Sequence, residues 1–308
     1  MKKTSIGGQA LIEGIMMKGP HKLAIAVRKP DGEIDVKVND VKKHKFTKVP
    51  VVRGMINFID SLVTGYKCLM HSANIAFDGM EDQTTKFEIW LEKKFGKKAT
   101  EALTMVAGVL GGMLAIVLFM VLPTTITGII NHFIPLGPFM AVVEGVLKLI
   151  IFFIYMWGIT YLDDVKRLFQ YHGAEHKTIA CYEAGDELTV ENVRKYSRLH
   201  PRCGTSFLFI VIIVSILVFS FVPWTSTLAR VALKLIFLPV VVGIAYEILK
   251  FTGRHENACT KILAAPGLFF QKFTTKEPED DMLEIAIAAI KACEPQVPDV
   301  ERNCAEEE

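Results

Sequence analysis

Long apolar runs alternate with short polar connectors over the central half of the chain. Each run approaches the length that an α-helix needs to cross roughly 30 Å of hydrocarbon, and the third run is the shortest. The four runs cover residues 104–130, 137–162, 206–221 and 228–251. This pattern predicts an α-helical integral membrane protein in which residues 104–251 form a bundle of four transmembrane helices.

Basic residues are distributed unevenly around these runs. The connectors 131–136 and 222–227 contain no Lys or Arg, whereas residues 1–103 contain 18 and residues 164–205 contain seven. Because segments rich in Lys and Arg stay on the cytoplasmic side of a membrane, we expect both termini and the loop 164–205 to be cytoplasmic. No cleavable signal peptide is expected, since the first apolar run begins about a hundred residues into the chain.

Short alternating segments near the N-terminus indicate strands rather than helices. The apolar segments lie at residues 10–17, 23–28 and 34–38, with turn residues at 30–32. They predict a small cytoplasmic β-meander over residues 1–50. Glu13 is a carboxylate inside the first apolar segment, and strand alternation would point it either at water or into a site as a catalytic carboxylate.

Helical periodicity is found on both sides of the bundle. Residues 51–103 should form amphipathic and connector helices, and residues 252–308 a cytoplasmic tail. The expected segments are an amphipathic helix at 51–69, a mixed-charge connector helix at 81–98, an interfacial segment at 259–273 and an acidic helix at 280–291. The interfacial helices would lie along the membrane surface or on the bundle.

Charged residues also occur inside the apolar runs, where isolated charges are costly. Glu144 and Lys148 lie one turn apart in the second run, and Arg230 and Lys234 lie in the fourth. We expect Glu144 to pair with Lys148 or Lys234. A structural clamp and a polar conduit both fit this arrangement.

Composition excludes several classes of protein. The chain is 51% hydrophobic, which argues against a soluble protein. A net charge of +2 argues against an intrinsically disordered chain, and no nucleic-acid partner is expected. The six cysteines form no C-x-x-C pair, which weakens zinc-ribbon, thioredoxin-like and disulfide-framework interpretations.

A motif that fits a metal site follows the second apolar run. The second predicted span is expected to continue as a helix as far as Gly185, and its residues 172–176 read His-Gly-Ala-Glu-His. This H-x-x-E-H spacing is that of inverted zinc metallopeptidases. One helical turn places His172 and His176 side by side, so both rings can bind one divalent ion. Glu175 would either polarise a metal-bound water as a catalytic base or serve as a further ligand.

Three further residues are candidate ligands for this ion. His200 and Cys203 precede the third span, and His200 is the favoured third ligand; Glu247 near the cytoplasmic end of the fourth span could supply a carboxylate. The cofactor predicted is a divalent metal, with zinc favoured. The alternative is that the histidines are hydrogen-bonded core residues without a metal.

Several longer motifs resemble one known family. The relevant stretches are Gly-Gly-Gln-Ala-Leu-Ile-Glu-Gly-Ile-Met-Met at 7–17, Lys-Val-Pro-Val-Val-Arg-Gly at 48–54, Tyr-His-Gly-Ala-Glu-His-Lys at 171–177 and Tyr-Ser-Arg-Leu-His-Pro-Arg-Cys-Gly-Thr-Ser-Phe at 196–207. They are similar to the bacterial YqhQ family, an uncharacterised group of membrane proteins sometimes described as predicted metal-dependent enzymes. The resemblance spans almost the whole chain and implies a location in the bacterial cytoplasmic membrane, without an established reaction.

The sequence therefore supports a ranked set of functions. The first is a metal-dependent hydrolase acting near the membrane surface on an unidentified peptide, ester or phosphoester. The second is a non-catalytic scaffold or accessory factor in membrane-protein biogenesis, and the third is a transporter that uses the intramembrane charges. The lipid bilayer is the expected partner together with an unidentified protein or substrate, and the oligomeric state stays open.

Overall fold

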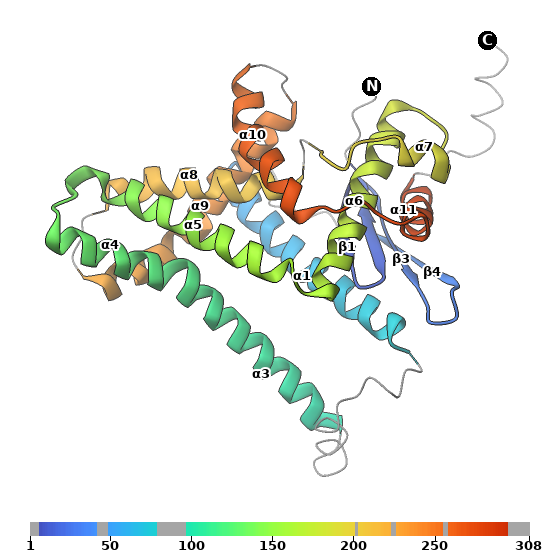
Figure 1. Cartoon of the computed structure of the whole chain (residues 1–308), viewed down its shortest axis with the longest axis horizontal. Coiled ribbons are helices and arrows are strands. Elements are labelled where there is room, and N and C mark those ends of the chain that lie inside the picture. Colours follow the sequence, from blue (N-terminus) through green and yellow to red (C-terminus); the bar gives the residue numbers. More distant parts are fainter. Residues whose placement is uncertain are drawn as a thin grey trace.

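The computed structural model describes residues 6–41, 49–78, 97–200, 203–222, 226–254 and 258–294. The protein is mostly helical, with one small antiparallel sheet near the N-terminus. Figure 1 shows a bundle of helices at one end and, at the other, a cap formed by the sheet with α6 (Asp163–Ala184), α7 (Val190–Arg194) and α11 (Asp280–Cys293), while α1 (Val52–Ala76) runs from the bundle to the sheet. Most of the connector helix expected at 81–98 lies outside the described residues.

The bundle contains the predicted apolar runs. Within the described residues, three helical stretches are long and apolar enough to cross a membrane, at Met105–Phe133, Gly137–Ile159 and Thr227–Thr252. A fourth apolar helix, Phe207–Ser220, is shorter, so its role as a fourth span stays a prediction. The helices are α3 (Lys97–Ile116), α4 (Leu122–Phe133), α5 (Met140–Ile159), α8 (Gly204–Ser220), α9 (Thr227–Arg254) and α10 (Ala258–Thr274).

The first stretch is continuous from α3 to α4 although it contains a proline. A π-helical turn, Val117–Val121, directly precedes α4, which has Pro123 in its first turn. Proline lacks an N–H and its ring crowds the carbonyl four residues earlier, and a wider turn accommodates both defects. In Figure 1, α3 extends away from the other helices.

The N-terminal strands form the predicted meander. The strands are β1 (Gly7–Leu11), β2 (Gly14–Lys18), β3 (Lys22–Arg28) and β4 (Ile34–Asp40), in the order β1-β2-β3-β4 with every pair antiparallel. The expectation of one strand over 10–17 is wrong, because β1 and β2 form a hairpin that turns at Ile12 and Glu13. Glu13 has a φ of 50°, a left-handed conformation that side chains other than glycine rarely adopt.

Both faces of the sheet are covered, which explains why β2 and β3 are almost wholly apolar. Ile15, Met17 and Ala26 belong to a core shared with α6 (Asp163–Ala184) and α11 (Asp280–Cys293). The alternate residues, among them Met16 and Ile25, pack with Cys68 and Ala76 of α1 (Val52–Ala76). Successive side chains of a strand point to opposite faces, so a central strand covered on both sides must be apolar throughout.

The acidic helix near the C-terminus is a core element. α11 covers the predicted segment 280–291, and Met282, Ile285 and Ile290 are completely buried. Its two leading aspartates, Asp280 and Asp281, stand at the helix N-terminus, where negative charge is favourable. α11 therefore joins the C-terminal part of the chain to strands more than 250 residues earlier in sequence.

α6 connects the bundle to the cap. The expectation of an uninterrupted helix from the second span is wrong, because α5 ends at Ile159 and α6 begins after an extended residue, Leu162. Asp163 and Asp164 then occupy the first turn of α6. The predicted stop is confirmed, since Gly185 has a φ of 84° and terminates α6 in a left-handed cap.

Aromatic packing holds the junction of bundle and cap in place. Phe270 of α10 is 1% exposed and stacks on Phe152 of α5 with ring centroids 4.8 Å apart. The same cluster includes Phe169 of α6 and Phe209 of α8. After α10 the chain crosses α6, where the N–H of Lys276 donates to the carbonyl of Phe169 at 2.8 Å.

Candidate metal centre

The two histidines of the H-x-x-E-H motif lie on one face of α6. A spacing of four residues brings side chains of a helix into contact. The ring centroids of His172 and His176 are 4.4 Å apart. The predicted side-by-side placement of the two rings is therefore present in the structure.

His172 has one nitrogen held by the backbone and the other directed at a thiol. Its Nδ1 lies 2.8 Å from the carbonyl oxygen of Thr274, at the end of α10. Because a carbonyl only accepts hydrogen bonds, this contact assigns the proton to Nδ1 and leaves a lone pair on Nε2 of the neutral ring. Nε2 lies 3.3 Å from Sγ of Cys203.

His176 repeats this arrangement with a different carbonyl. Its Nδ1 lies 2.6 Å from the carbonyl oxygen of Arg198, in the loop between α7 (Val190–Arg194) and α8. The ring is 1% exposed, and its Nε2 is buried without a hydrogen-bond partner among the described residues. A buried polar nitrogen without a partner is costly unless another group binds it.

Cys203 completes a group of three potential ligands. One ligand atom from each of His172, His176 and Cys203 lies within 4.8 Å of the other two. Two ligands of a tetrahedral zinc ion, one nitrogen and one sulfur, stand about 3.6 Å apart. The observed 3.3 Å between His172 and Cys203 is close to that separation, and the remaining atoms would approach by up to about 1.5 Å around an ion.

His200, the favoured third ligand from the sequence, lies beside this group and not within it. Its ring centroid is 5.7 Å from that of His176, and its Nε2 lies 3.6 Å from a carboxylate oxygen of Glu183. Gln271 of α10 holds the backbone of His200 from both sides, accepting from its N–H and donating to its carbonyl at 2.8 Å each. His200 therefore shapes the loop that presents Cys203.

Glu175 is buried between α6 and the sheet. Its side chain is against Gly8 of β1, where an added Cβ would overlap the carboxylate. Burial raises the pKa of the Glu175 carboxyl to about 7, against the opposing influence of nearby His172 and of the Gly8 N–H that donates to it. Such a carboxyl can hold or release a proton near neutral pH.

Gly173 allows the segment after α10 to approach α6. A Cβ at Gly173 would overlap the carbonyl oxygen of Lys276. The absent side chain lets residues 274–276 pass directly over the helix, which brings the Thr274 carbonyl to His172. This glycine of the motif therefore has a packing role next to the candidate ligands.

Glu13 and Glu247 lie apart from the group formed by His172, His176 and Cys203, and each pairs with an arginine. Glu13 pairs with Arg167 of α6 and accepts a hydrogen bond from the Tyr171 hydroxyl at 3.1 Å. Burial and the Glu13 carboxylate raise the pKa of Tyr171, so this hydroxyl stays a donor. Glu247 pairs with Arg53 of α1 through both guanidinium nitrogens that face it. Both carboxylates fix helix contacts, and neither joins the histidine and cysteine group.

Sequence patterns did not indicate the groups that orient the rings. The Thr274 and Arg198 carbonyls belong to the backbone, which carries no signature in side-chain patterns. Gln271 is fully buried, yet it occupies an unremarkable position in an apolar segment. Metal-binding histidines commonly donate their second N–H to a carbonyl or carboxylate, so these supporting groups belong to the candidate centre.

The donor set determines what this arrangement can do. Two imidazole nitrogens and one thiolate are ligands that zinc accepts in four-coordinate sites. Three protein ligands leave one coordination position for water or substrate, as in catalytic zinc sites. The site lies where α6 of the cap meets the beginning of α8 in the bundle (Figure 1).

Comparisons with known proteins connect this site to one family. The sequence profile of a family described as "Protein of unknown function (DUF1385)" matches residues 49–296. Over 287 residues the chain is 37% identical to "Uncharacterized protein YqhQ" of Bacillus subtilis (strain 168), covering 91% of this chain and 89% of that protein. No solved structure matches the chain. All three potential ligands lie within the matched residues.

Proposed function

We propose a function for this chain, which belongs to the DUF1385 family, as its resemblance to YqhQ proteins predicted. The geometry of its candidate site supports a membrane-embedded zinc protein. His172, His176 and Cys203 bind the ion, and one coordination position stays open for water. In this proposal the three long apolar helices cross the bilayer, and the basic loop 164–205 puts the centre at the cytoplasmic end of the bundle. Metal-dependent hydrolysis is the reaction class that such a centre fits best.

One observation carries the proposal. Both rings donate from Nδ1 to backbone carbonyls, which leaves the Nε2 lone pairs as the free ligand positions, and Nε2 of His176 is buried without a partner among the described residues. Hydrogen bonding alone explains His172, since Cys203 can donate to it. It does not explain His176, for which a bound cation supplies the missing partner.

The surrounding residues suit a hydrolytic role. A zinc ion bound by three protein ligands lowers the pKa of its water and supplies a nucleophile near neutral pH. In this proposal Glu175, which directly precedes His176 in α6, is the base that takes up a proton. The substrate would be a peptide, ester or phosphoester that reaches the inner surface of the bilayer.

Elemental analysis of the protein purified in detergent tests the site. We expect one zinc per chain in the wild type, and loss of most of it in His176→Ala and in Cys203→Ser. His132→Ala is the matched control, because His132 is exposed at the opposite end of the bundle. His200→Asn should retain zinc, since His200 lies outside the group of converging atoms.

Cobalt substitution distinguishes the ligands spectroscopically. A cobalt-loaded protein should show a thiolate-to-metal absorption band that disappears in Cys203→Ser and persists in His200→Asn. Wild-type protein that binds no transition metal, or a His176→Ala variant that binds it unchanged, would rule out the proposed centre.

A structural role is the second candidate, because the ligands connect the cap to the bundle. His172 and His176 belong to α6, whereas Cys203 precedes α8. A metal with that role would hold the two parts together in a non-catalytic scaffold. Removing zinc should then lower the melting temperature of the cap, because an ion that binds only the folded state stabilises it.

A further inference from the structure

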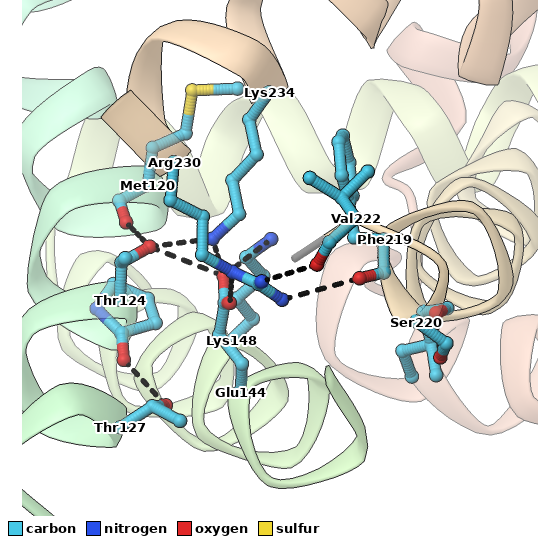
Figure 2. Close-up of polar contacts among 12 residues, drawn as sticks. Met120, Thr124, Thr127, Glu144, Lys148, Phe219, Ser220, Val222, Arg230 and Lys234 are labelled. Atoms are coloured by element: carbon cyan, nitrogen blue, oxygen red, sulfur yellow. Dashed lines mark hydrogen bonds and ion pairs between the residues drawn. The ribbon is translucent and has the colours of Figure 1, made fainter. Parts of the chain in front are cut away.

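A cluster of charged side chains lies inside the bundle, apart from the candidate metal centre. Glu144 of α5 is surrounded by Lys148 of the same helix and by Arg230 and Lys234 of α9. Figure 2 shows the four side chains converging, with Thr124 of α4 beside them. Glu144, Arg230 and Lys234 are each at most 2% exposed. The sequence-based expectation that Glu144 pairs with Lys148 or Lys234 is confirmed for both.

The cluster carries more positive than negative charge. The apolar segments Met105–Phe133, Gly137–Ile159, Phe207–Ser220 and Thr227–Thr252 contain just two acidic residues, Glu144 and Glu247. Glu247 pairs with Arg53 and lies toward the other end of α9. Glu144 is therefore the single carboxylate that these segments offer to three cations, which leaves a formal surplus of two positive charges.

Part of this surplus is offset by the end of a helix. The guanidinium of Arg230 donates to the carbonyls of Phe219 and Val222 at 3.3 and 3.1 Å, at the C-terminus of α8. A helix C-terminus carries about half a negative charge, so it compensates Arg230 in part. Lys234 donates to Thr124 and Glu144 and is completely enclosed. The remaining surplus is most accessible at Lys148, whose side chain is 17% exposed.

Lys148 stands in a crevice that opens between α5 and α8. Glu144 and Lys148 line one wall, and Ser215 and Ile216 of α8 line the other. Gly145 keeps the two helices close, because a Cβ there would overlap Ile216. The crevice has a volume of about 10 Å³, which is room for about one water-sized atom. It can admit one oxygen atom of a larger anionic group whose remainder stays outside.

The depth of the charged cluster within the bundle indicates which molecule supplies the anionic group. Lys148 lies eight residues after Met140, the first residue of α5, which is about 12 Å along a helix axis, and its Nζ reaches back to the carboxylate of Glu144, one turn nearer that end. Arg230 lies in the first turn of α9, and both positions are near the end of the bundle that is farthest from the sheet (Figure 1). The phosphates of a bilayer lie several ångströms beyond its hydrocarbon, within reach of a lysine side chain at this depth.

We infer that this crevice binds the phosphate of an anionic phospholipid in the leaflet opposite the cap, with Lys148 Nζ and the Ser215 hydroxyl as donors. The lipid phosphate neutralises the surplus charge around Glu144, and its acyl chains lie along the apolar surfaces of α5 and α8. The inference rests on the part of the proposed function that places the bundle in a bilayer. It is independent of the metal centre.

Lipid binding to the purified protein provides the test. The protein in a neutral detergent is titrated with phosphatidylglycerol, or with phosphatidylcholine of the same acyl chains, and bound lipid is counted by native mass spectrometry. We expect the wild type to prefer phosphatidylglycerol by about fivefold or more. Lys148→Met should abolish this preference, and Lys37→Met, the same change on exposed β4, should retain it.

Ser215→Ala keeps the test decisive if Lys148→Met does not fold. This smaller change removes one donor from the crevice and should weaken the preference severalfold. Equal binding of the two lipids by the wild type, or an unchanged preference in Lys148→Met, would overturn the inference. If inorganic phosphate alone competes for the crevice, its ligand is a free anion and the lipid inference is wrong. If the wild type shows no lipid preference but co-purifies with a membrane protein that Lys148→Met loses, the ligand is an acidic helix of a partner protein.

Zinc content measured on the same samples separates the two proposals. Protein that binds zinc without lipid preference would refute the lipid site alone. Protein that prefers phosphatidylglycerol without zinc would refute the metal centre alone.

Discussion

Substitutions at Glu13 should separate backbone strain from side-chain bonding at the contact between the sheet and α6. Glu13 occupies the turn of the first hairpin with a φ of 50°. Its carboxylate pairs with Arg167 and accepts from the hydroxyl of Tyr171, a residue that is fully buried. The strain opposes folding and the two bonds favour it, so three replacements distinguish them.

The structure sets the expected order of the free energies of unfolding. Glu13→Gln keeps an acceptor but loses the charge, which should cost about 1 kcal/mol because the Arg167 side chain is partly exposed. Glu13→Ala removes both bonds and leaves the Tyr171 hydroxyl buried without its acceptor, which should cost about 3 kcal/mol. Glu13→Gly loses the same bonds but relieves the left-handed strain, so it should be about 1 kcal/mol more stable than the alanine variant.

Cysteine labelling of the native protein measures these differences. Cys293 of α11 is 1% exposed, and burial raises the pKa of its thiol, so it reacts when the cap opens. A difference of about 1 kcal/mol changes the labelling rate about fivefold. Equal rates for the alanine and glycine variants would refute the strain argument. A glutamine variant that labels as slowly as the wild type would refute a contribution from the ion pair.

Three other perturbations test separate features of the cap. Gly173→Ala should push the Lys276 carbonyl off α6 and so reduce zinc retention about tenfold. Competition with a chelator measures this retention, and an unchanged value would contradict the packing role of this glycine. Ile285→Ala removes a fully buried side chain of α11 and should lower the free energy of unfolding by about 2 to 5 kcal/mol, whereas Val38→Ala on exposed β4 should change it by less than about 0.5 kcal/mol. Burial raises the pKa of Tyr182 from 10.0 to about 12, so the unfolded state loses its proton first and cap stability should fall as pH rises from 10 to 12. Tyr182→Phe should flatten that decline in a pH series of labelling rates, and a decline of unchanged slope would exclude this tyrosine as its source.

Much of the secondary structure could be predicted because its causes are local. Apolar runs of membrane-spanning length produced the long helices, and Gly185 ended α6 where a left-handed residue is needed. Thr189 caps α7 with its side chain, as a threonine ahead of a short helix should. The hairpin at Glu13 was missed because its left-handed turn residue is not one of the usual ones, so alternation alone suggested a single strand.

The candidate site was predictable in part for the same reason. His172 and His176 are one helical turn apart, so helix geometry alone sets their rings side by side. The choice between His200 and Cys203 was not a local matter. Both belong to the same loop, and Gln271, from a helix about seventy residues later, fixes the backbone of His200 and so determines which side chain reaches the pair.

The sequence by itself determined the apolar helices, the meander and the spacing of the two histidines. These features depend on residue type and on periods of two or about 3.6 residues, which can be read along the chain. Only the tertiary structure decided that α11 lies in the core of the cap, that Cys203 joins the histidines and that Glu144 stands among three cations. Those outcomes depend on contacts between residues far apart in sequence, where packing and charge are balanced over the whole molecule and no short pattern records the partner.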